Sequence, residues 1–478
     1  MKTIFSRSAV ALTLGATLAL TACEKQLDLA PPQSVDATTA LNSEAKVGSA
    51  VIGLYAKLDE PSLYGTQLIL VPDVLGGDGY VNWQGSFTTY RELIRRTTTS
   101  INNIAETIWR VAYQDINQAN LVINALEVVA SKDLKAQYEG EARFVRADLL
   151  FELVRLYGKQ YNAGTASTDL GVPISLTPAQ TLEDAAVEQP RATVAQVYQQ
   201  VITDLQAAIK LLPPTNGFRA SSYTAKALLA RVYLQQGNYA EALTLADDVI
   251  KNSGKSLSPT LQAVFTNRNS SESLFEIQQN DQNNAGTSNN GLATFYANID
   301  QLGRGDVQVL GSFSNQYGPT DVRGTDSLTA DQTKKLIYIG TGPTRAPDLL
   351  RSGKWTSYGQ NIPVIRLAEM YLIRAEASFR AGDSETALAD VNRIRTRSNA
   401  TPLTADEISL SAILRERQLE LAFEGFRIHD LKRTGTNVTY TATDGTPVTI
   451  DITNPRFVLP VPQREINVNP SLIQNASY

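Results

Sequence analysis

The spacing of apolar positions along the chain predicts a mostly helical protein. Apolar residues recur three and four positions apart through residues 44–58, 104–129 and 132–157, which is the periodicity of amphipathic helices. Residues 194–212 and 410–423 continue this pattern. We therefore expect an all-α fold in which long helices form the body of the protein.

The middle of the chain contains an internal repeat. Residues 225–250 and 368–394 each place an alanine seven residues before a glycine, Gly237 or Gly382, and a second alanine five residues after it. Glycine suits the left-handed backbone at a helix end, and the alanines allow two helices to approach closely. This is the pattern of the helix pairs in tetratricopeptide repeats. We expect each glycine to permit a tight turn between two packed helices.

Other segments predict loops. Residues 280–291, NDQNNAGTSNNG, are too polar to be buried, and the chain stays rich in Gly, Asn, Asp and Thr to about residue 363. A structureless stretch of this length in a compact protein is usually functional or disordered. β-Favouring residues alternate around Asp444-Gly445, which predicts a β-hairpin, and the Pro-interrupted tail at 457–475 is expected to be extended.

The first 22 residues have the features of a bacterial export signal. Lys2 and Arg7 precede a 14-residue run of apolar and small residues, which is shorter than the ~20 residues that a membrane-spanning helix needs. The run ends in Leu-Thr-Ala-Cys, and this ending resembles the lipobox of bacterial lipoproteins. We expect residues 1–22 to be a signal peptide and Cys23 to be the lipid attachment site. The alternative is an ordinary signal peptide whose cleavage site happens to contain a cysteine.

Composition narrows the class of protein further. The chain has 43 basic and 48 acidic residues, so its net charge of −5 offers no electrostatic surface for nucleic acid. Cys23 is the single cysteine and His429 the single histidine, which excludes an internal disulfide, a thiolate metal site and a multi-histidine zinc site. We expect no cofactor. Residues 23–42 are polar and contain prolines, which is typical of a tether.

Five blocks of sequence together resemble the SusD/RagB family of outer-membrane lipoproteins in Bacteroidetes. The lipobox is the first block, and the others are AKALLARVYLQQGNY, VIRLAEMYLIRAEA, ILRERQLELAFEGFRIHDLKR and LPVPQREINVNPSLIQN. The resemblance runs from Cys23 to the C-terminus and is weakest across about 280–350. It implies a helical fold built on tetratricopeptide-like helix pairs. Residues 43–478 would then be one domain that carries a loop-rich, ligand-facing insertion at about 280–363.

The resemblance also implies a partner and a place in the cell. Members of the family lie over a SusC-like TonB-dependent β-barrel transporter as a nutrient-capturing lid. We expect a lipid-anchored protein at the cell outer membrane, exposed at the surface, that captures an oligosaccharide or polysaccharide and delivers it to such a transporter. Two alternatives stay open: a peptide-binding, RagB-like uptake lipoprotein, and a tetratricopeptide-type structural lipoprotein that binds no small ligand.

A cluster of charged residues near the C-terminus has the composition of a catalytic site. Glu416, Glu420 and Glu424 lie four residues apart, so they share one helix face with arginines that can pair with them. A glycosidase needs two carboxylates at a set separation across a cleft, and spacing along a helix does not show this. We favour salt bridges at the end of a structural helix, a structural role for His429, and no enzyme activity.

Acidic residues in the loops give only weak evidence for a metal site. Asp321, Asp326 and Asp331 lie five residues apart and could gather around calcium. The segment DQNNAG, from Asp281, lacks the oxygen ligand that an EF-hand loop has at its fifth position. We favour solvated loop carboxylates and expect no metal.

Aromatic residues in two loop regions are the candidates for ligand binding. Sugars pack their C–H faces on flat rings, and their hydroxyl groups bond to amides and other short polar side chains. The first region, residues 70–90, is rich in glycine, which leaves space for a ligand. Trp83 is the best single candidate, although Trp83 and Tyr80 could instead cap the core, and Phe87 is expected in the core. The candidates are Trp83, Tyr80, Asn82, Gln84 and Tyr90 from this region and Phe295, Tyr296 and Tyr317 from the insertion.

Overall fold

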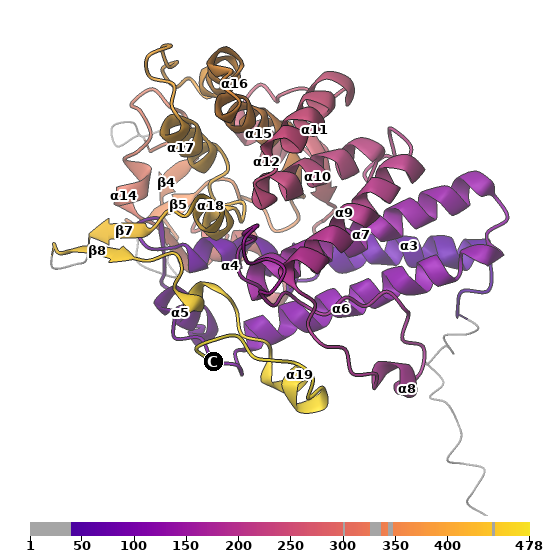
Figure 1. Cartoon of the computed structure of the whole chain (residues 1–478). Helices are drawn as coiled ribbons and strands as arrows, with labels where there is room; N and C mark the ends of the chain where they lie inside the picture. Colours follow the sequence, from indigo (N-terminus) through magenta and orange to yellow (C-terminus); the bar gives the residue numbers. More distant parts are fainter. Residues whose placement is uncertain (1–39, 300–301, 326–335, 343–347, 442–444) are drawn as a thin grey trace, which may run out of the picture.

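The computed structural model describes residues 40–299, 302–325, 336–342, 348–441 and 445–478. The expected signal peptide, Cys23 and most of the expected tether therefore lie outside the described residues. The body is helical, as the periodicity predicts (Figure 1). The α-helices are α3 (Glu44–Leu58), α4 (Gln67–Leu75), α5 (Thr88–Arg95), α6 (Asn103–Asn124), α7 (Lys132–Tyr157), α8 (Leu182–Ala185), α9 (Val194–Leu211), α10 (Ser222–Gln236), α11 (Tyr239–Asn252), α12 (Leu261–Thr266), α13 (Leu292–Tyr296), α14 (Gly311–Ser314), α15 (Leu367–Arg380), α16 (Ser384–Arg397), α17 (Leu410–Glu420), α18 (Arg427–Thr434) and α19 (Gln463–Val468).

Side-chain caps fix where the long helices begin. Ser43 and Ser131 accept hydrogen bonds from main-chain N–H groups in the first turns of α3 and α7, and Thr193 forms a capping box with Gln196 at the start of α9. The bounds of α3 and α7 are those that the periodicity predicts. Among the described residues, none of these helices is both long enough and apolar enough to span a membrane.

The internal repeat is confirmed. Helices α10 and α11 form one pair and α15 and α16 the other, and α11 packs against α15, so the two pairs stack (Figure 1). Gly237 ends α10 with a φ of +82°, and Gly382 lies between α15 and α16 with a φ of +90°. Both glycines therefore have the left-handed backbone that lets a second helix start within a few residues.

Helix α4 lies inside the protein. All nine of its residues are buried, including Asp73 and Pro72. A helix that is covered on every side needs no polar face, so its sequence has no amphipathic period. For this reason the segment from Leu70 onward reads as irregular in the sequence although it forms a helix.

Short antiparallel strands connect segments that are far apart in the sequence. The described residues contain four two-stranded sheets: β1 (Val81–Trp83) with β3 (Val307–Val309), β2 (Ser273–Ile277) with β6 (Ile362–Arg366), β4 (Ile337–Ile339) with β5 (Leu350–Ser352), and β7 (Val438–Thr441) with β8 (Pro447–Ile450). The β7–β8 pair confirms the predicted hairpin; Gly445 has a φ of +86°, and Asp444 lies outside the described residues. Single 3-10 turns are η1 (Leu126–Val128), η2 (Ala285–Ser288) and η4 (Pro455–Phe457).

The expected loop insertion at about 280–363 is held to the body by two strand pairings, one within it and one at its C-terminal end. Strand β3 pairs with β1 in the first loop region, and β6 pairs with β2 just before α15 begins. Buried side chains from the insertion, among them Phe295, Tyr296 and Phe313, belong to the main core. Strand β4 pairs with β5, and both appear on the same side of the view as α14 (Figure 1). The insertion and the first loop region together carry the candidate site.

Candidate functional site

Trp83, the best candidate from the sequence, is a core residue. Only 5% of its surface is exposed, and its indole N–H donates to the main-chain carbonyl of Phe87 at 3.1 Å. The ring packs on Tyr90 and Phe295, with centroids 4.4 and 5.4 Å away. A Cβ at Gly85 would collide with the indole, so this glycine makes room for Trp83 rather than for a ligand. The expectation that the Trp83 ring is exposed is therefore wrong.

Other aromatic candidates also have structural contacts. The Tyr80 hydroxyl accepts from the Phe423 N–H at 2.6 Å, and the Tyr296 hydroxyl donates to the Asp73 carboxyl group at 2.9 Å. Tyr317 is half-buried and donates to the Leu419 carbonyl at 2.9 Å. The rings of Tyr80, Tyr90, Phe295 and Tyr296 are each at most 3% exposed. These four present no ring face to solvent, which corrects the expectation that they flank an open site.

Phe87, and not Trp83, is the exposed ring of this loop. It precedes α5 and is 41% exposed, although the sequence places it in the core. One edge of its ring meets the buried Phe295 at 6.2 Å between centroids. The Arg304 guanidinium lies 5.0 Å from the ring centroid. Because Trp83 fills the interior beside it, Phe87 stays at the surface.

Tyr358 is a second exposed ring on the same side. It is 38% exposed, and its hydroxyl accepts from the main-chain N–H of Gly303 at 3.0 Å. Gly303 immediately precedes Arg304, so Phe87 and Tyr358 contact consecutive residues of one short segment. The Arg304 side chain is fixed by Asp306, to which it donates from Nε at 2.9 Å and from Nη2 at 2.6 Å.

Amide side chains lie beside these rings. Asn82 pairs with Gln308 across β1 and β3, and Gln84 donates from Nε2 to the Gln308 Oε1 at 2.8 Å. Alternation along β1 directs Val81 and Trp83 into the core and Asn82 away from it. Asn82 and Gln84 thus lie toward solvent, where the sequence places them. We call Phe87, Arg304 and Tyr358, together with Asn82, Gln84 and Gln308, the loop face.

The loop face has the chemistry of a carbohydrate-binding surface. Its two partly exposed rings can pack against C–H groups, and its amides offer both donors and acceptors to hydroxyl groups. It is formed by loops and short strands on a helical body, as binding surfaces often are. Sequence reasoning missed Phe87, Tyr358 and Arg304. The alternation of Val81, Asn82 and Trp83 was the available signal that Trp83 points inward.

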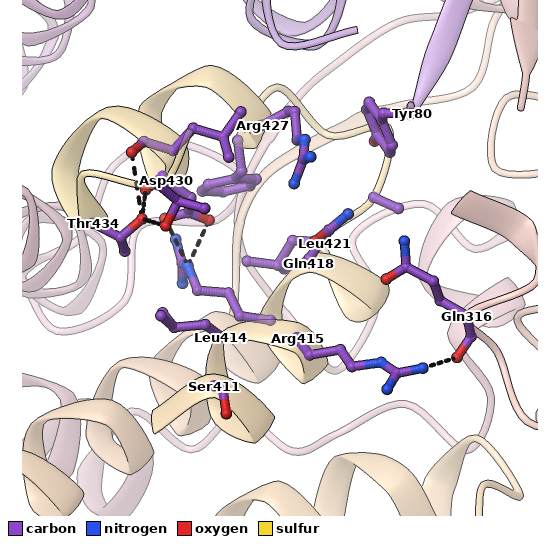
Figure 2. A pocket seen from close by; sticks show the side chains of 15 residues that line it. Tyr80, Gln316, Ser411, Leu414, Arg415, Gln418, Leu421, Arg427, Asp430 and Thr434 are labelled. Atoms are coloured by element: carbon purple, nitrogen blue, oxygen red, sulfur yellow. Dashed lines mark hydrogen bonds and ion pairs between the residues drawn. The ribbon is translucent and has the colours of Figure 1, made fainter. Parts of the chain in front are cut away.

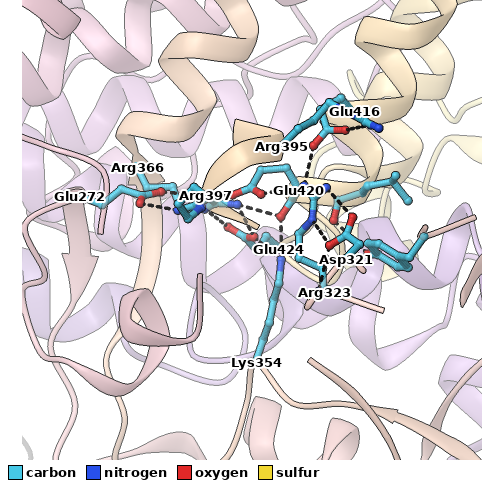
Figure 3. Close-up of polar contacts among 12 residues, drawn as sticks. Glu272, Asp321, Arg323, Lys354, Arg366, Arg395, Arg397, Glu416, Glu420 and Glu424 are labelled. Carbon is cyan, nitrogen blue, oxygen red and sulfur yellow. Dashed lines mark hydrogen bonds and ion pairs between the residues drawn. The ribbon is translucent and has the colours of Figure 1, made fainter. Parts of the chain in front are cut away.

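The charged cluster forms a buried network of ion pairs (Figure 3). Glu420 accepts from Arg366 at 2.6 Å and from Arg323 at 3.0 Å, and it also pairs with Arg397. Glu424 pairs with Lys354 at 2.6 Å and with Arg366 at 2.8 Å. These side chains come from α16, α17, β6 and the insertion, so the network ties those segments together.

Electrostatics keep Glu420 and Glu424 ionised. Burial alone would raise the pKa of Glu420, but Arg397, Arg366 and Arg323 hold that pKa well below its usual value. Burial likewise opposes the effect of Arg366 and Lys354 on Glu424, whose pKa is also lowered. Glu416 accepts from Arg323 at 2.6 Å and from Arg395 at 2.9 Å. A general acid must carry a proton near neutral pH, and Glu420 and Glu424 do not.

Comparison with known proteins shows which family the chain is similar to. Residues 346–478 match the model of the SusD family, and residues 25–234 match a model described as "Starch-binding associating with outer membrane". The chain is 28% identical to SusD-like protein P2 of Formosa agariphila, over 95% of both chains. It is 25% identical to the starch-binding protein SusD of Bacteroides thetaiotaomicron, over 77% of both. A crystal structure of a SusD superfamily protein from Bacteroides thetaiotaomicron superposes with a TM-score of 0.77 at 27% identity, covering 91% of this chain and 99% of that one.

The chain belongs to the SusD/RagB family. The family that the sequence resembles is thereby confirmed, and so is the helical SusD-like fold. In this SusD/RagB protein the loop face lies outside the stacked helix pairs, on the segment between α4 and α5 and on the segment between α11 and α15.

The acidic loop residues and the single histidine are the remaining polar candidates from the sequence. Within the described ranges, no group of three or more His, Cys, Asp or Glu side chains is placed to hold a metal ion. Asp321 pairs with Arg323 at 2.8 Å, and Asp326 and Asp331 lie outside those ranges. His429 is 1% exposed, and burial, aided by Arg155, lowers its pKa well below the usual value. It is therefore a neutral core residue.

Proposed function

We propose that this SusD/RagB protein captures a glycan on the loop face. The observation that carries the proposal is the pair of exposed rings, Phe87 and Tyr358, which both contact the segment that holds Gly303 and Arg304. Membership of a family that includes the starch-binding protein SusD supports a carbohydrate ligand. The amides of Asn82, Gln84 and Gln308 supply the hydrogen-bonding groups that sugar hydroxyls need.

We further propose that the protein is a lipoprotein of the outer membrane that delivers its ligand to a SusC-like TonB-dependent transporter. The lipobox-like ending at Cys23 and the family-model description "associating with outer membrane" support this location. Two or three acyl chains on Cys23 would anchor the protein stably, whereas one chain would hold it only marginally.

The anchor is tested by replacing Cys23 with alanine in cells fed a labelled fatty acid. The label should enter the wild-type protein, and the C23A variant should be released as soluble protein or remain an uncleaved precursor. A variant that stays at the outer membrane with labelled acyl chains would refute the anchor. Surface exposure is tested in the same cells by protease accessibility without lysis.

Binding without hydrolysis is the third part of the proposal. The carboxylates of the C-terminal cluster are engaged in ion pairs, which supports a structural role for them. Purified protein should leave a bound glycan intact over long incubation. Turnover that disappears in the E420Q variant would overturn this part. The same variant should also lower the stability of the fold, because it breaks buried ion pairs.

A peptide ligand is the second candidate, because the same amides can pair with peptide groups. The two candidates are separated by screening lipid-free protein against a glycan array and a peptide library in parallel. Binding to glycans alone supports the proposal, and binding to peptides alone favours a RagB-like role. Binding to neither would favour the structural lipoprotein.

A further inference from the structure

A pocket that is separate from the loop face lies between α17 and α18. It has a volume of about 330 Å³, and its walls include Tyr80, Leu414, Leu421 and Phe426. Figure 2 shows the side chain of Arg427 extending toward Leu421, with no dashed line from its guanidinium group to another residue drawn. The pocket thus combines apolar walls with an arginine side chain.

Arg427 lacks a partner for its charge. Within the described ranges, no oxygen atom accepts a hydrogen bond from its side chain, and its Nε is buried. The Tyr80 ring, 5.5 Å from the guanidinium carbon, is its aromatic neighbour. A buried donor that is left unpaired costs free energy, and a charged one costs more. Water can satisfy a donor in an open pocket, but it does not neutralise the charge.

Asp73 and Asp430 both act on Arg427 through their charges without pairing with it, and Asp430 is already engaged. Its carboxylate accepts from the Nε of Arg417 at 2.9 Å and from the Nε of Arg433 at 2.7 Å. Arg417 is 2% exposed and lines the pocket, and its Nη1 is a buried donor with no partner. Within the described residues Arg427 therefore makes no ion pair at this pocket, while the one carboxylate that lines the pocket, Asp430, is used by two other arginines.

A third arginine lines the same pocket. Arg415 is exposed, and its Nη2 donates to the main-chain carbonyl of Gln316 at 2.9 Å (Figure 2). No carboxylate within the described residues pairs with it. The contrast with the ion network is clear, because Arg323 and Arg366 each pair there with three carboxylates.

We propose that this pocket binds a small hydroxylated carboxylate, of the sugar-acid class. A planar carboxylate would supply a counter-charge to Arg427 and Arg415, which make no ion pair within the described residues, and it matches the paired N–H groups of a guanidinium. The hydroxyl and amide side chains of Ser411, Gln418 and Thr434 line the pocket and can bond to hydroxyl groups. The apolar walls suit the C–H face of a ring, and the volume lies at the low end of that for small-molecule sites.

The test is binding of D-glucuronate to the lipid-free protein by titration calorimetry, with D-glucose as the neutral match. Glucuronate should bind, its affinity should fall as salt is added, and glucose should bind at least tenfold more weakly. R427Q should weaken glucuronate binding by roughly tenfold or more, and R415Q by a smaller factor. Since Arg415 is exposed, R415Q tests the pocket even where R427Q lowers stability.

Two controls separate this site from a general effect of charge. R110Q removes a half-buried arginine of α6 that does not line the pocket, and it should leave glucuronate binding unchanged. Acetate and inorganic sulfate should bind more weakly than glucuronate, because they lack the ring and its hydroxyl groups. Equal affinity for sulfate, or glucuronate binding that survives both R427Q and R415Q, would overturn the proposal.

Failure here is distinguishable from failure of the proposed function. F87A alters the loop face and should leave glucuronate binding unchanged, since Phe87 is not part of the pocket. Loss of glucuronate binding in F87A, with full binding in R427Q, would assign the carboxylate to the loop face and refute the pocket.

Discussion

The indole N–H of Trp83 donates to the main-chain carbonyl of Phe87, and this bond joins a buried ring to an exposed one. Trp83 fills the interior between Tyr90 and Phe295, so the chain that follows it turns outward and presents Phe87. The two aromatic residues of one short loop therefore have different roles. Trp83 stabilises the loop, and Phe87 is available to a ligand.

Replacing Trp83 with alanine should destabilise the fold. Removing a large buried aromatic side chain typically costs about 3–5 kcal/mol, because the cavity does not fully collapse. Chemical denaturation of W83A should therefore show a lower midpoint. F87A is the matched control, since a ring that is 41% exposed should contribute about 1 kcal/mol or less. Equal stability of W83A and wild type would show that Trp83 is not a core residue.

Replacing either repeat glycine with alanine should strain the backbone. Gly237 and Gly382 have φ values of +82° and +90°, where an alanine costs about 1–2 kcal/mol. A Cβ at either position would meet no neighbouring atom, so any loss of stability reports on the backbone alone. Gly311 is the control, because its φ is not positive and its Cβ would also meet nothing. Thermal melting should separate the two kinds of site, and three equal melting temperatures would contradict the helix-turn assignment.

Neutralising Glu420 should lower the free energy of unfolding of the protein. In E420Q, Arg323, Arg366 and Arg397 lose a shared carboxylate in the interior, and breaking a buried ion pair in this way costs about 3–5 kcal/mol. The exposed Glu407 is the control, and E407Q should change the unfolding free energy by about 0.5 kcal/mol or less. An E420Q variant as stable as E407Q would show that the network does not hold the fold.

Stability should depend on pH through Asp73. Burial raises the pKa of this carboxyl group to about 7, against a lowering effect of the Tyr296 hydroxyl. The folded protein therefore keeps a proton that the unfolded chain loses near its usual pKa of 3.8, so stability from this group is lost as pH rises toward 7. The loss is at most about 4 kcal/mol.

D73N isolates this effect, because asparagine stays neutral and can still accept from Tyr296. Its unfolding free energy relative to wild type should rise steadily between about pH 4 and pH 7 and then level off. The relative value is the appropriate readout, and it reports the ionisation of Asp73 together with its interaction with the nearby Lys354, which D73N also removes. A difference that does not change with pH would show that Asp73 ionises normally in the folded protein.

Much of the fold could be predicted from the sequence, because long surface helices carry their own period. Helices α3 and α7 begin and end where the apolar spacing predicts, and the glycines of both helix pairs mark their turns. Helix α4 was not predicted, because every one of its residues is buried and no polar face remains to give a period. The same limit applies to any element that is covered on all sides.

The candidate site was predicted less well, since exposure in a loop depends on distant residues. Whether Trp83 or Phe87 points inward is decided by Phe295 and by strand β3, more than 200 residues away in the sequence. Of the candidates from the first loop region, Asn82 and Gln84 are the two whose side chains lie toward solvent. The local sequence does not identify Tyr358 as part of the site. Tyr358 contacts Gly303, and the next residue, Arg304, contacts Phe87, but neither contact can be read from the sequence.

The most direct test of the loop face is a glycan array probed with the lipid-free wild-type protein and with the F87A/Y358A double variant. Wild type should bind at least one oligosaccharide. The double variant should bind that oligosaccharide roughly ten- to a hundredfold more weakly, which corresponds to about 1.4–2.8 kcal/mol, and should keep a nearly unchanged melting temperature. Full affinity in the double variant, with the fold intact, would contradict the assignment of glycan capture to the loop face.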